Sequence, residues 1–255
     1  MKKVENMTVL SNELIARKIY KCVLSGQLVN EITEPGQFVH VKVSGGTEPT
    51  LRRPISICEI DRAQESLTMI YRVEGKGTKL LSEKRDGETV DVLGPLGNGF
   101  PIEGLKPNAH CLLVGGGIGV PPLYELAKQL VSKGHNVTTV IGFRSTDDVF
   151  LEKEFAILGD TYVVTEDGTS GEQGFVTDII KKYQLSCDRY YACGPRMMLR
   201  ALETMMPENG YLSLEERMGC GIGACLACVC DTQDKVSYRK VCTDGPVFPV
   251  GEVVV

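Results

Sequence analysis

The sequence of 255 residues has no tryptophan and only three histidines, and no apolar run approaches the roughly 20 residues of a membrane-spanning helix. We therefore expect no membrane partner. The formal charge at pH 7 is only -5, and no basic stripe with interleaved aromatic residues occurs, so nucleic acid is not an expected partner either. The histidines are scattered and form no ligand set. Neither a Ser/His/Asp arrangement nor a carboxylate pair indicates hydrolysis.

A signal peptide is also lacking, whereas cysteine is abundant, with ten residues. Because several cysteines stand in apolar segments, we expect reduced thiols and a cytoplasmic location rather than a secreted disulfide scaffold. The length allows two domains and a small appendage, with a core that needs no disulfides. Four cysteines are expected to be buried apolar residues: Cys22, Cys58, Cys111 and Cys187.

Four other cysteines form a distinct pattern near the C-terminus. Cys220, Cys225 and Cys228 are spaced C-x4-C-x2-C, and Cys242 follows at a distance. This spacing is typical of the thiolates around a plant-type [2Fe-2S] cluster. Two glycines between the first two cysteines would let the backbone wrap closely around inorganic sulfides. The pattern predicts these four cysteines as cluster ligands; a tetrahedral zinc site, a disulfide pair or buried thiols are the alternatives.

A further cysteine, Cys230, stands two residues beyond Cys228. We interpret Cys230, which stands in an extended strand after Val229, as a non-ligand. Turn-forming residues at 231–235 would bring the chain back toward the site with Cys242.

The first part of the chain predicts an antiparallel barrel. Short alternating segments recur at 7–12, 16–23, 38–43, 55–60, 66–73 and 89–93, with turn-forming sequences between them. Many short strands at near-regular spacing are typical of antiparallel barrels.

Two polar motifs interrupt this barrel pattern. Arg53-Pro54-Ile55-Ser56 begins a strand, and the planar fork of an arginine binds phosphate oxygens bidentately. Gly75-Lys76-Gly77-Thr78 precedes a predicted helix at 79–84, whose first N–H groups would bind an anion with Thr78 as cap. Each motif alone could be an ordinary surface arginine or turn. Together they predict a phosphate-bearing cofactor.

The second part predicts a parallel α/β sheet. An apolar strand at 110–114 is followed by the turn Gly115-Gly116-Gly117-Ile118-Gly119 and an amphipathic helix at 123–130. This order lets backbone approach a pyrophosphate, although Val120 replaces the third glycine of a Rossmann fingerprint. Further strands are expected at 137–143, 162–164 and 189–193, and helices at 152–157, within 175–183 and at 197–205.

The ends of two predicted strands carry residues of interest. Cys193 ends the strand at 189–193, at the edge where open α/β sheets bind ligands, or it is a buried structural residue. Asp147 and Asp148 follow the strand at 137–143 and would repel a 2′-phosphate, whereas Arg144 and Ser145 could attract one. The balance favours NAD over NADP.

Taken together, these motifs and Cys193-Gly194-Pro195 resemble the ferredoxin–NADP reductase superfamily over residues 5–205. The resemblance implies an FAD-binding barrel domain at 1–102 and an NAD-binding α/β domain at 103–210. It implies FAD contacts from Arg53, Pro54, Ile55, Ser56, Ile70, Tyr71, Arg72, Gly77 and Thr78. It implies NAD contacts from Gly115, Gly116, Gly117, Ile118, Gly119, Cys193, Gly194 and Pro195, with Cys193 near the nicotinamide. Many members carry an aromatic residue where this chain has Ile55, so stacking on the flavin must differ.

The remaining segment, 211–255, resembles a narrower family. The run from Met218 to Cys228, and Cys242-x2-Gly245-Pro246-Val247-Phe248, are similar to the electron-transfer subunits of NAD-linked (type B) dihydroorotate dehydrogenases. The resemblance covers the whole chain and implies a small [2Fe-2S] domain at 211–255. It further implies that electrons pass from an FMN-containing catalytic subunit through the cluster and FAD to NAD+ in pyrimidine (UMP) biosynthesis, within a heterotetramer of two copies of each subunit.

Cofactor chemistry explains why these three sites would share a chain. A nicotinamide exchanges electron pairs as hydride, a [2Fe-2S] centre exchanges single electrons, and a flavin converts between the two. The same sites would also suit the flavin and iron–sulfur subunit of a soluble hydrogenase or of a ferredoxin:NADP oxidoreductase. A zinc-bearing scaffold without redox activity and a diaphorase that needs no partner are further alternatives.

Overall fold

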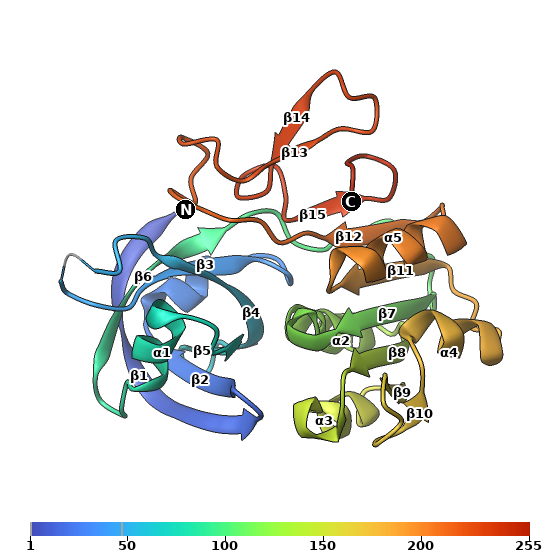
Figure 1. Cartoon of the computed structure of the whole chain (residues 1–255), viewed down its shortest axis with the longest axis horizontal. Helices are drawn as coiled ribbons and strands as arrows, with labels where there is room; N and C mark the ends of the chain where they lie inside the picture. The colour runs from blue at the N-terminus through green and yellow to red at the C-terminus, as the bar shows by residue number, and fades with distance from the viewer. Residues whose placement is uncertain (1, 47) are drawn as a thin grey trace.

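The computed structural model describes residues 2–46 and 48–255, which form a barrel, an α/β sheet and a C-terminal segment lying across both (Figure 1). The barrel closes with the strand order β1-β2-β5-β4-β3-β6, and all neighbouring strands are antiparallel. Its strands are β1 Lys3–Ala16, β2 Ile19–Ser25, β3 Phe38–Lys42, β4 Arg53–Asp61, β5 Ser66–Arg72 and β6 Thr89–Leu96. All six predicted strands are therefore present.

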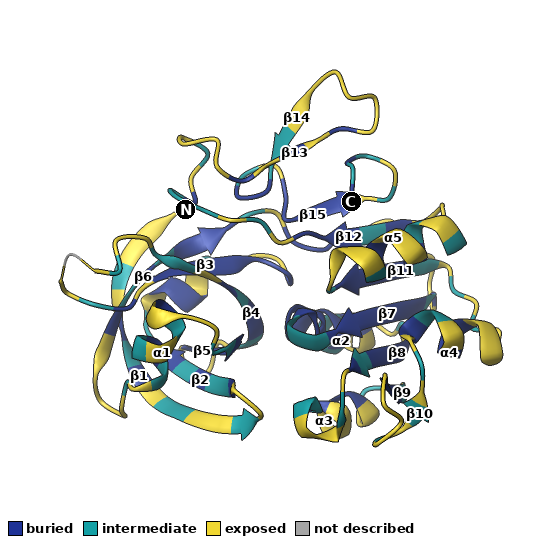
Figure 2. Cartoon of the chain, in the orientation of Figure 1, coloured by how far each residue is buried: buried dark blue, intermediate teal, exposed yellow. Residues whose placement is uncertain are grey.

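Alternation along these strands builds the barrel core. Met7 and Val9 of β1, and Cys22 and Leu24 of β2, point inward and are fully buried, because side chains alternate between the two faces of a strand. The outer face of β1 is largely exposed (Figure 2). Two short helices complete the barrel: the 3-10 helix η1 Gln27–Glu31 and the α-helix α1 Lys76–Ser82.

Helix α1 begins three residues before the predicted start at residue 79. Gly75 is the N-cap, and Thr78 lies inside the first turn. The Thr78 Oγ1 atom accepts hydrogen bonds from the N–H groups of Glu74 and Gly75, at 3.1 and 3.3 Å. Thr78 therefore stabilises the helix start from within, which allows the helix to include the glycine turn.

The α/β sheet has seven strands in the order β10-β9-β8-β7-β11-β12-β15. Its strands are β7 His110–Gly116, β8 Asn136–Phe143, β9 Asp160–Thr165, β10 Glu172–Gln173, β11 Arg189–Cys193, β12 Gly210–Ser213 and β15 Val247–Pro249. All are parallel except β15, which pairs antiparallel with β12. The sequence did not predict β10, β12 or β15, which are short.

The helices lie on both faces of this sheet. They are α2 Pro122–Ser132, α3 Glu152–Ala156, α4 Val176–Lys182 and α5 Arg196–Met205, with the 3-10 helices η2 Gly117–Gly119 and η3 Thr146–Asp148. Cys111 and Leu113 of β7 pack in the cluster that contains α2, whereas Leu112 and Val114 pack in the cluster that contains α4 and α5. Because α2 also packs against β4, it joins the sheet to the barrel.

The C-terminal segment is joined to the sheet at both ends. After β12 the chain runs without regular structure to a two-stranded hairpin, β13 Val229–Asp231 and β14 Tyr238–Lys240, and then returns as β15. The hairpin extends outward from the rest of the molecule and its tip is exposed (Figure 2).

Candidate functional site

A cleft of about 230 Å³ lies where the barrel, the sheet and the C-terminal segment meet. Every residue predicted to contact FAD lines it except Gly77. The predicted nucleotide turn contributes Ile118. The sequence did not predict the remaining lining residues, which are Phe38, Glu74, Ser213, Leu214, Glu215, Glu216, Met218 and Pro246.

Gly77 lies directly against the motif arginine. A Cβ atom on Gly77 would come within 2.2 Å of Arg53 Nε and 2.6 Å of its Nη2. The Arg53 guanidinium also donates to the carbonyl oxygens of Leu51 and Arg52. These contacts hold the guanidinium against the first turn of α1, so the two polar motifs of the barrel form one site.

An aromatic side chain reaches the cleft from a strand that the sequence did not single out. Phe38 of β3 pairs in register with Ser56 of β4 and lines the cleft, and Ile55 both lines the cleft and packs in the barrel core. Tyr71 donates its hydroxyl to Asn12 Oδ1 at 3.0 Å, and Arg72 pairs with Glu74 at 3.2 Å. Phe38 is thus the aromatic ring beside Ser56, the last residue of the β4 motif.

The two predicted NAD segments meet at the carboxyl ends of β7 and β11. Cys193 is in register with Gly115, and a Cβ on Gly119 would come within 2.4 Å of the Cys193 carbonyl oxygen. A Cβ on Gly116 would come within 2.8 Å of Pro195 Cδ. The glycines therefore also allow two strand ends to pack together, in addition to any approach by a ligand.

The glycine turn also contacts the flavin cleft. A Cβ on Gly117 would lie 3.1 Å from Arg72 Nη2, at the end of β5. Cys193 itself is 1% exposed, and its burial raises the pKa of the thiol well above the ordinary value. The thiol is therefore protonated at neutral pH, and it lies behind the cleft beside Ser213 rather than in its lining.

The four predicted cluster ligands come together in two pairs. Cys220 Sγ accepts N–H groups of Ile222, Ala224 and Cys225 at 3.3–3.4 Å, and Cys225 Sγ accepts the Cys220 N–H at 3.4 Å. Cys228 and Cys242 form the second pair through a side-chain hydrogen bond and are buried, whereas Cys225 is exposed. One pair of sulfurs thus faces the surface and the other faces the interior.

The pKa values of these thiols differ because Cys220 accepts backbone N–H groups, whereas Cys242 is buried. Desolvation raises the pKa of Cys220, but the N–H groups of Ile222 and Cys225 outweigh it and lower the pKa to about 6. Burial, followed by a hydrogen bond with Cys228, raises the pKa of Cys242 to about 11. A loop that presents N–H groups to sulfur stabilises thiolate, which is the form that ligates iron.

The pairing distinguishes between the possible metals. Tetrahedral zinc takes four ligands around one point, whereas the four cysteines form two pairs, Cys220 with Cys225 and Cys228 with Cys242. Two pairs of thiols fit a centre with two irons, each of which takes two protein sulfurs. The cysteine loop therefore fits a [2Fe-2S] cluster better than zinc.

A buried histidine supports this loop from the barrel. His40 of β3 is fully buried, and a Cβ on Gly221 would come within 2.6 Å of its Nδ1. Burial, with the nearby Arg52, lowers the pKa of His40 to about 4, so its ring is neutral. Arg52 donates to the carbonyl oxygens of His40 and Asp91, at 3.2 and 3.1 Å. No sequence pattern indicated this support, since His40 stands in an ordinary barrel strand.

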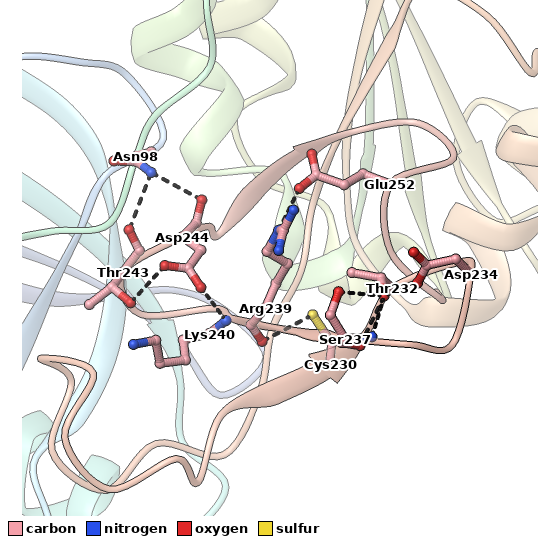
Figure 3. A network of polar contacts seen from close by, with 10 residues as sticks. All are labelled: Asn98, Cys230, Thr232, Asp234, Ser237, Arg239, Lys240, Thr243, Asp244 and Glu252. Atoms are coloured by element: carbon pink, nitrogen blue, oxygen red, sulfur yellow. Dashed lines mark hydrogen bonds and ion pairs between the residues drawn. The ribbon is translucent and has the colours of Figure 1, made fainter.

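A polar network ties the Cys242 turn to the barrel and to the hairpin (Figure 3). Asn98 Nδ2 donates to the carbonyl oxygens of Thr243 and Asp244, at 3.2 and 3.0 Å. Cys230 Sγ instead donates to the Arg239 carbonyl at 3.6 Å, within the hairpin. The thiol of Cys230 is thus directed to the β14 backbone.

Comparisons with known proteins agree with this geometry. Residues 215–254 match the family model for the iron-sulfur cluster binding domain of dihydroorotate dehydrogenase B, and residues 113–204 match the oxidoreductase NAD-binding domain. The chain is 60% identical over 256 residues to the dihydroorotate dehydrogenase B (NAD(+)) electron transfer subunit of Geobacillus sp. (strain WCH70), with 100% of both chains covered. It is 58% identical over 258 residues to the subunit of that name from Bacillus cereus (strain ATCC 14579), again with 100% coverage. The chain belongs to this family.

Solved structures place the fold of this dihydroorotate dehydrogenase B electron transfer subunit family in a wider group. An NADH-dependent reduced ferredoxin–NADP oxidoreductase superposes with a TM-score of 0.86 at 30% identity, over 97% of this chain and 89% of that one. A cytochrome P450 reductase from Amycolatopsis shares the fold, with a TM-score of 0.71 at 23% identity, over 83% of this chain and 69% of that one. The predicted barrel, parallel sheet and cluster segment are confirmed.

Membership of the family confirms several predictions. The chain is an electron-transfer subunit of an NAD-linked oxidoreductase, and its cofactors are FAD, a [2Fe-2S] cluster and NAD. A catalytic subunit is its partner, as the family name implies. No helix among the described residues is both long enough and apolar enough to cross a membrane.

Proposed function

We propose that this subunit passes electrons from dihydroorotate, oxidised at FMN on a separate catalytic subunit, to NAD+. The observation that carries the proposal is that one cleft joins three groups of residues. They are the barrel residues Arg53 to Ser56, the nucleotide turn through Ile118, and the segment Ser213 to Met218 that leads into Cys220. Electron transfer among three cofactors requires such proximity.

The residues of the chain bind and orient the cofactors. We propose FAD contacts from the residues named for it above, with Arg53, Gly77 and Thr78 at its phosphates and Phe38 added beside the ring. Residues 115–119 and 193–195 would bind NAD, and the four cysteines would hold the cluster. When bound, the flavin exchanges electron pairs with the nicotinamide and single electrons with the cluster.

We further propose three functional domains: flavin binding at 1–102, nucleotide binding at 103–210 and cluster binding at 211–255. The strands β12 and β15 join the last of these to the nucleotide sheet, which would keep the cluster at a fixed distance from the cleft. The working assembly would be a cytoplasmic heterotetramer with two copies of each subunit.

The cluster loop supports a docking surface for the catalytic subunit. Ile222 and Leu226 flank the surface pair of cysteines and are 49% and 48% exposed, although both are large apolar residues. Because a one-electron path must be short, the FMN of the partner would have to approach the exposed Cys225. Exposed apolar side chains at that point suit the core of a protein interface.

The first test is to purify the chain anaerobically with whatever polypeptide accompanies it, and to quantify iron, sulfide, FAD and FMN. We expect flavin and cluster absorbance, with FMN present only when a second polypeptide is present. The complex should then reduce NAD+ with dihydroorotate, while the isolated chain should not. A colourless protein that contains zinc would contradict the proposal, and so would full dihydroorotate turnover by this chain alone.

Docking at the cluster loop predicts the effect of a charged substitution there. Leu226→Asp should weaken association with the catalytic subunit about tenfold or more, because it places an unpaired charge in an apolar contact. Iron content and NADH-dependent dye reduction by the isolated subunit should not change. Ile157→Asp is the matched control, since Ile157 is 84% exposed and ends α3, which packs on β9, toward the edge of the sheet opposite β15. Equal co-purification of both variants would contradict this surface.

A second function is favoured by the TM-score of 0.86 to a ferredoxin–NADP oxidoreductase. In that case reduced ferredoxin, rather than a dihydroorotate-oxidising subunit, would supply the electrons. Dihydroorotate and reduced ferredoxin offered separately to the purified complex distinguish the two, and the family of the chain leads us to expect turnover with dihydroorotate.

A further inference from the structure

A turn of the flavin barrel holds the loop that follows β8 in the nucleotide sheet; in Figure 1 the β1–β2 turn approaches the sheet near α3. Arg17 in that turn donates from Nε to Asp148 Oδ1 at 3.0 Å and from Nη2 to Asp148 Oδ2 at 2.7 Å. Its backbone N–H donates to the Asp147 carbonyl at 2.9 Å, and Nη2 lies 3.5 Å from Ser145 Oγ. The planar guanidinium of Arg17 therefore binds the Asp148 carboxylate bidentately. The backbone N–H of Arg17 holds the backbone of Asp147.

The same loop is held from its other side. The N–H of Thr146 donates to Thr169 Oγ1 at 2.8 Å, and that hydroxyl in turn donates to Asp167 Oδ1 at 2.6 Å. Residues 145–148 are thus fixed between the barrel and the loop after β9. Such double support is what a preformed binding loop requires.

The loop that Arg17 contacts lies at the nucleotide-binding edge of the sheet. β7 and β8 are neighbouring parallel strands, so the glycine turn after β7 and the loop after β8 lie at the same edge of the sheet. In nucleotide-binding α/β sheets, an acidic residue beyond the second strand accepts hydrogen bonds from the ribose hydroxyls of NAD. A basic residue there accommodates the 2′-phosphate of NADP.

The two acidic residues of the loop are not equivalent. Both carboxylate oxygens of Asp148 accept hydrogen bonds from Arg17, and its side chain is only 22% exposed. The carboxylate of Asp147 is exposed and makes no hydrogen bond within the described part of the chain. Of these two residues, only Asp147 therefore has a carboxylate free to accept hydrogen bonds from a ribose.

We propose that Arg17, a residue of the flavin barrel, is a positioning residue of the nucleotide site. Arg17 holds Asp148 and the backbone of Asp147, and so leaves the Asp147 carboxylate free. That carboxylate accepts hydrogen bonds from the ribose hydroxyls of NAD and repels the 2′-phosphate of NADP. The proposal rests on the proposed function only in taking a pyridine nucleotide as the ligand of this sheet edge. It makes nucleotide choice depend on both halves of the molecule.

The experiment uses the FAD-loaded, cluster-containing subunit and titrates NAD+ and NADP+ by calorimetry, with steady-state reduction of a dye by NADH and NADPH alongside. The variants are Arg17→Ala, Arg17→Lys, Asp147→Asn and Asp148→Asn. Arg85→Ala is the matched control, because Arg85 is an exposed arginine of the same barrel whose side chain makes no hydrogen bond among the described residues.

Each variant has its own expected result. Asp147→Asn should shift the ratio of NADP+ to NAD+ affinity by about tenfold toward NADP+, because the repelling charge is removed. Arg17→Ala and Asp148→Asn should weaken NAD+ binding about three- to tenfold and raise KM with kcat unchanged, with no gain in relative NADP+ affinity. Arg17→Lys should weaken NAD+ binding less than Arg17→Ala, since lysine retains the charge but cannot bind the Asp148 carboxylate bidentately. Arg85→Ala should bind like the wild type.

Two outcomes would overturn the proposal. One is a relaxed preference in Asp148→Asn but not in Asp147→Asn, and the other is unchanged NAD+ affinity in Arg17→Ala. Failure of the one premise taken from the proposed function, a pyridine nucleotide at this sheet edge, is distinguishable, since the unmodified subunit would then bind neither nucleotide and its flavin would be reduced by neither NADH nor NADPH.

Discussion

At the scale of single residues, glycine stands where two segments approach too closely for a side chain. Gly77 illustrates this, because a Cβ there would overlap the Arg53 guanidinium rather than backbone. Since the end of an arginine side chain can move, the fold should tolerate such a Cβ while the phosphate site would not. Gly75, two residues earlier, faces open space.

We therefore expect Gly77→Ala to weaken FAD binding about tenfold or more, because displacing Arg53 removes a charge-assisted hydrogen bond to phosphate. The free energy of unfolding of the apoprotein should stay the same or rise by up to about 1 kcal/mol, since alanine favours helix over glycine. Flavin fluorescence during titration of FAD measures the first effect and urea unfolding measures the second. Gly75→Ala is the control, and equal FAD affinity of the two variants would count against the role of Arg53.

At the scale of elements, the short strand β15 has a larger role than its three residues suggest. Phe248 of β15 is 2% exposed, pairs in register with Leu212 of β12, and packs under the turn after Cys242, where a Cβ on Gly245 would come within 2.4 Å of its ring. The strand therefore joins the fourth cluster ligand to the nucleotide sheet.

Phe248→Ala should lower the free energy of unfolding by about 3–5 kcal/mol, the usual cost of removing a buried aromatic ring. Iron content per chain should fall as well, because the Cys242 turn loses its support. Urea unfolding and iron analysis check both. Phe175→Ala, at a ring that is 62% exposed, should change stability by less than about 0.5 kcal/mol. Full iron content in a destabilised Phe248→Ala protein would show that β15 does not support the cluster site.

At the scale of the whole molecule, the barrel and the sheet are joined through a buried carboxylate. Glu125 of α2 is 6% exposed and accepts the N–H of Ile60 in β4 at 3.1 Å. Lys128, on the same helix, pairs with Glu59 of β4 at 2.9 Å. These contacts fix α2 against the barrel, and hence the nucleotide turn against the flavin cleft.

Glu125→Ala should lower the free energy of unfolding by about 1–3 kcal/mol, because it leaves the partly buried N–H of Ile60 without its acceptor. Thermal unfolding monitored by circular dichroism measures the change. Glu103→Ala removes the carboxylate of an exposed pair with Lys133, 3.3 Å apart, and should have almost no effect. A similar melting temperature for the two variants would mean that the hydrogen bond from Ile60 to Glu125 does not stabilise the contact between the halves.

The sequence by itself determined the features that depend on local spacing. Alternation predicted all six barrel strands, a continuous apolar run predicted β7, and the spacing of Cys220, Cys225 and Cys228 predicted a cluster. Tertiary structure alone decided the pairing of four sulfurs into two pairs, the addition of β15 to the sheet, and the hold of Arg17 on Asp148. Those contacts join segments far apart in the chain, so no local pattern specifies them; they form only when the packed barrel and sheet bring the segments together.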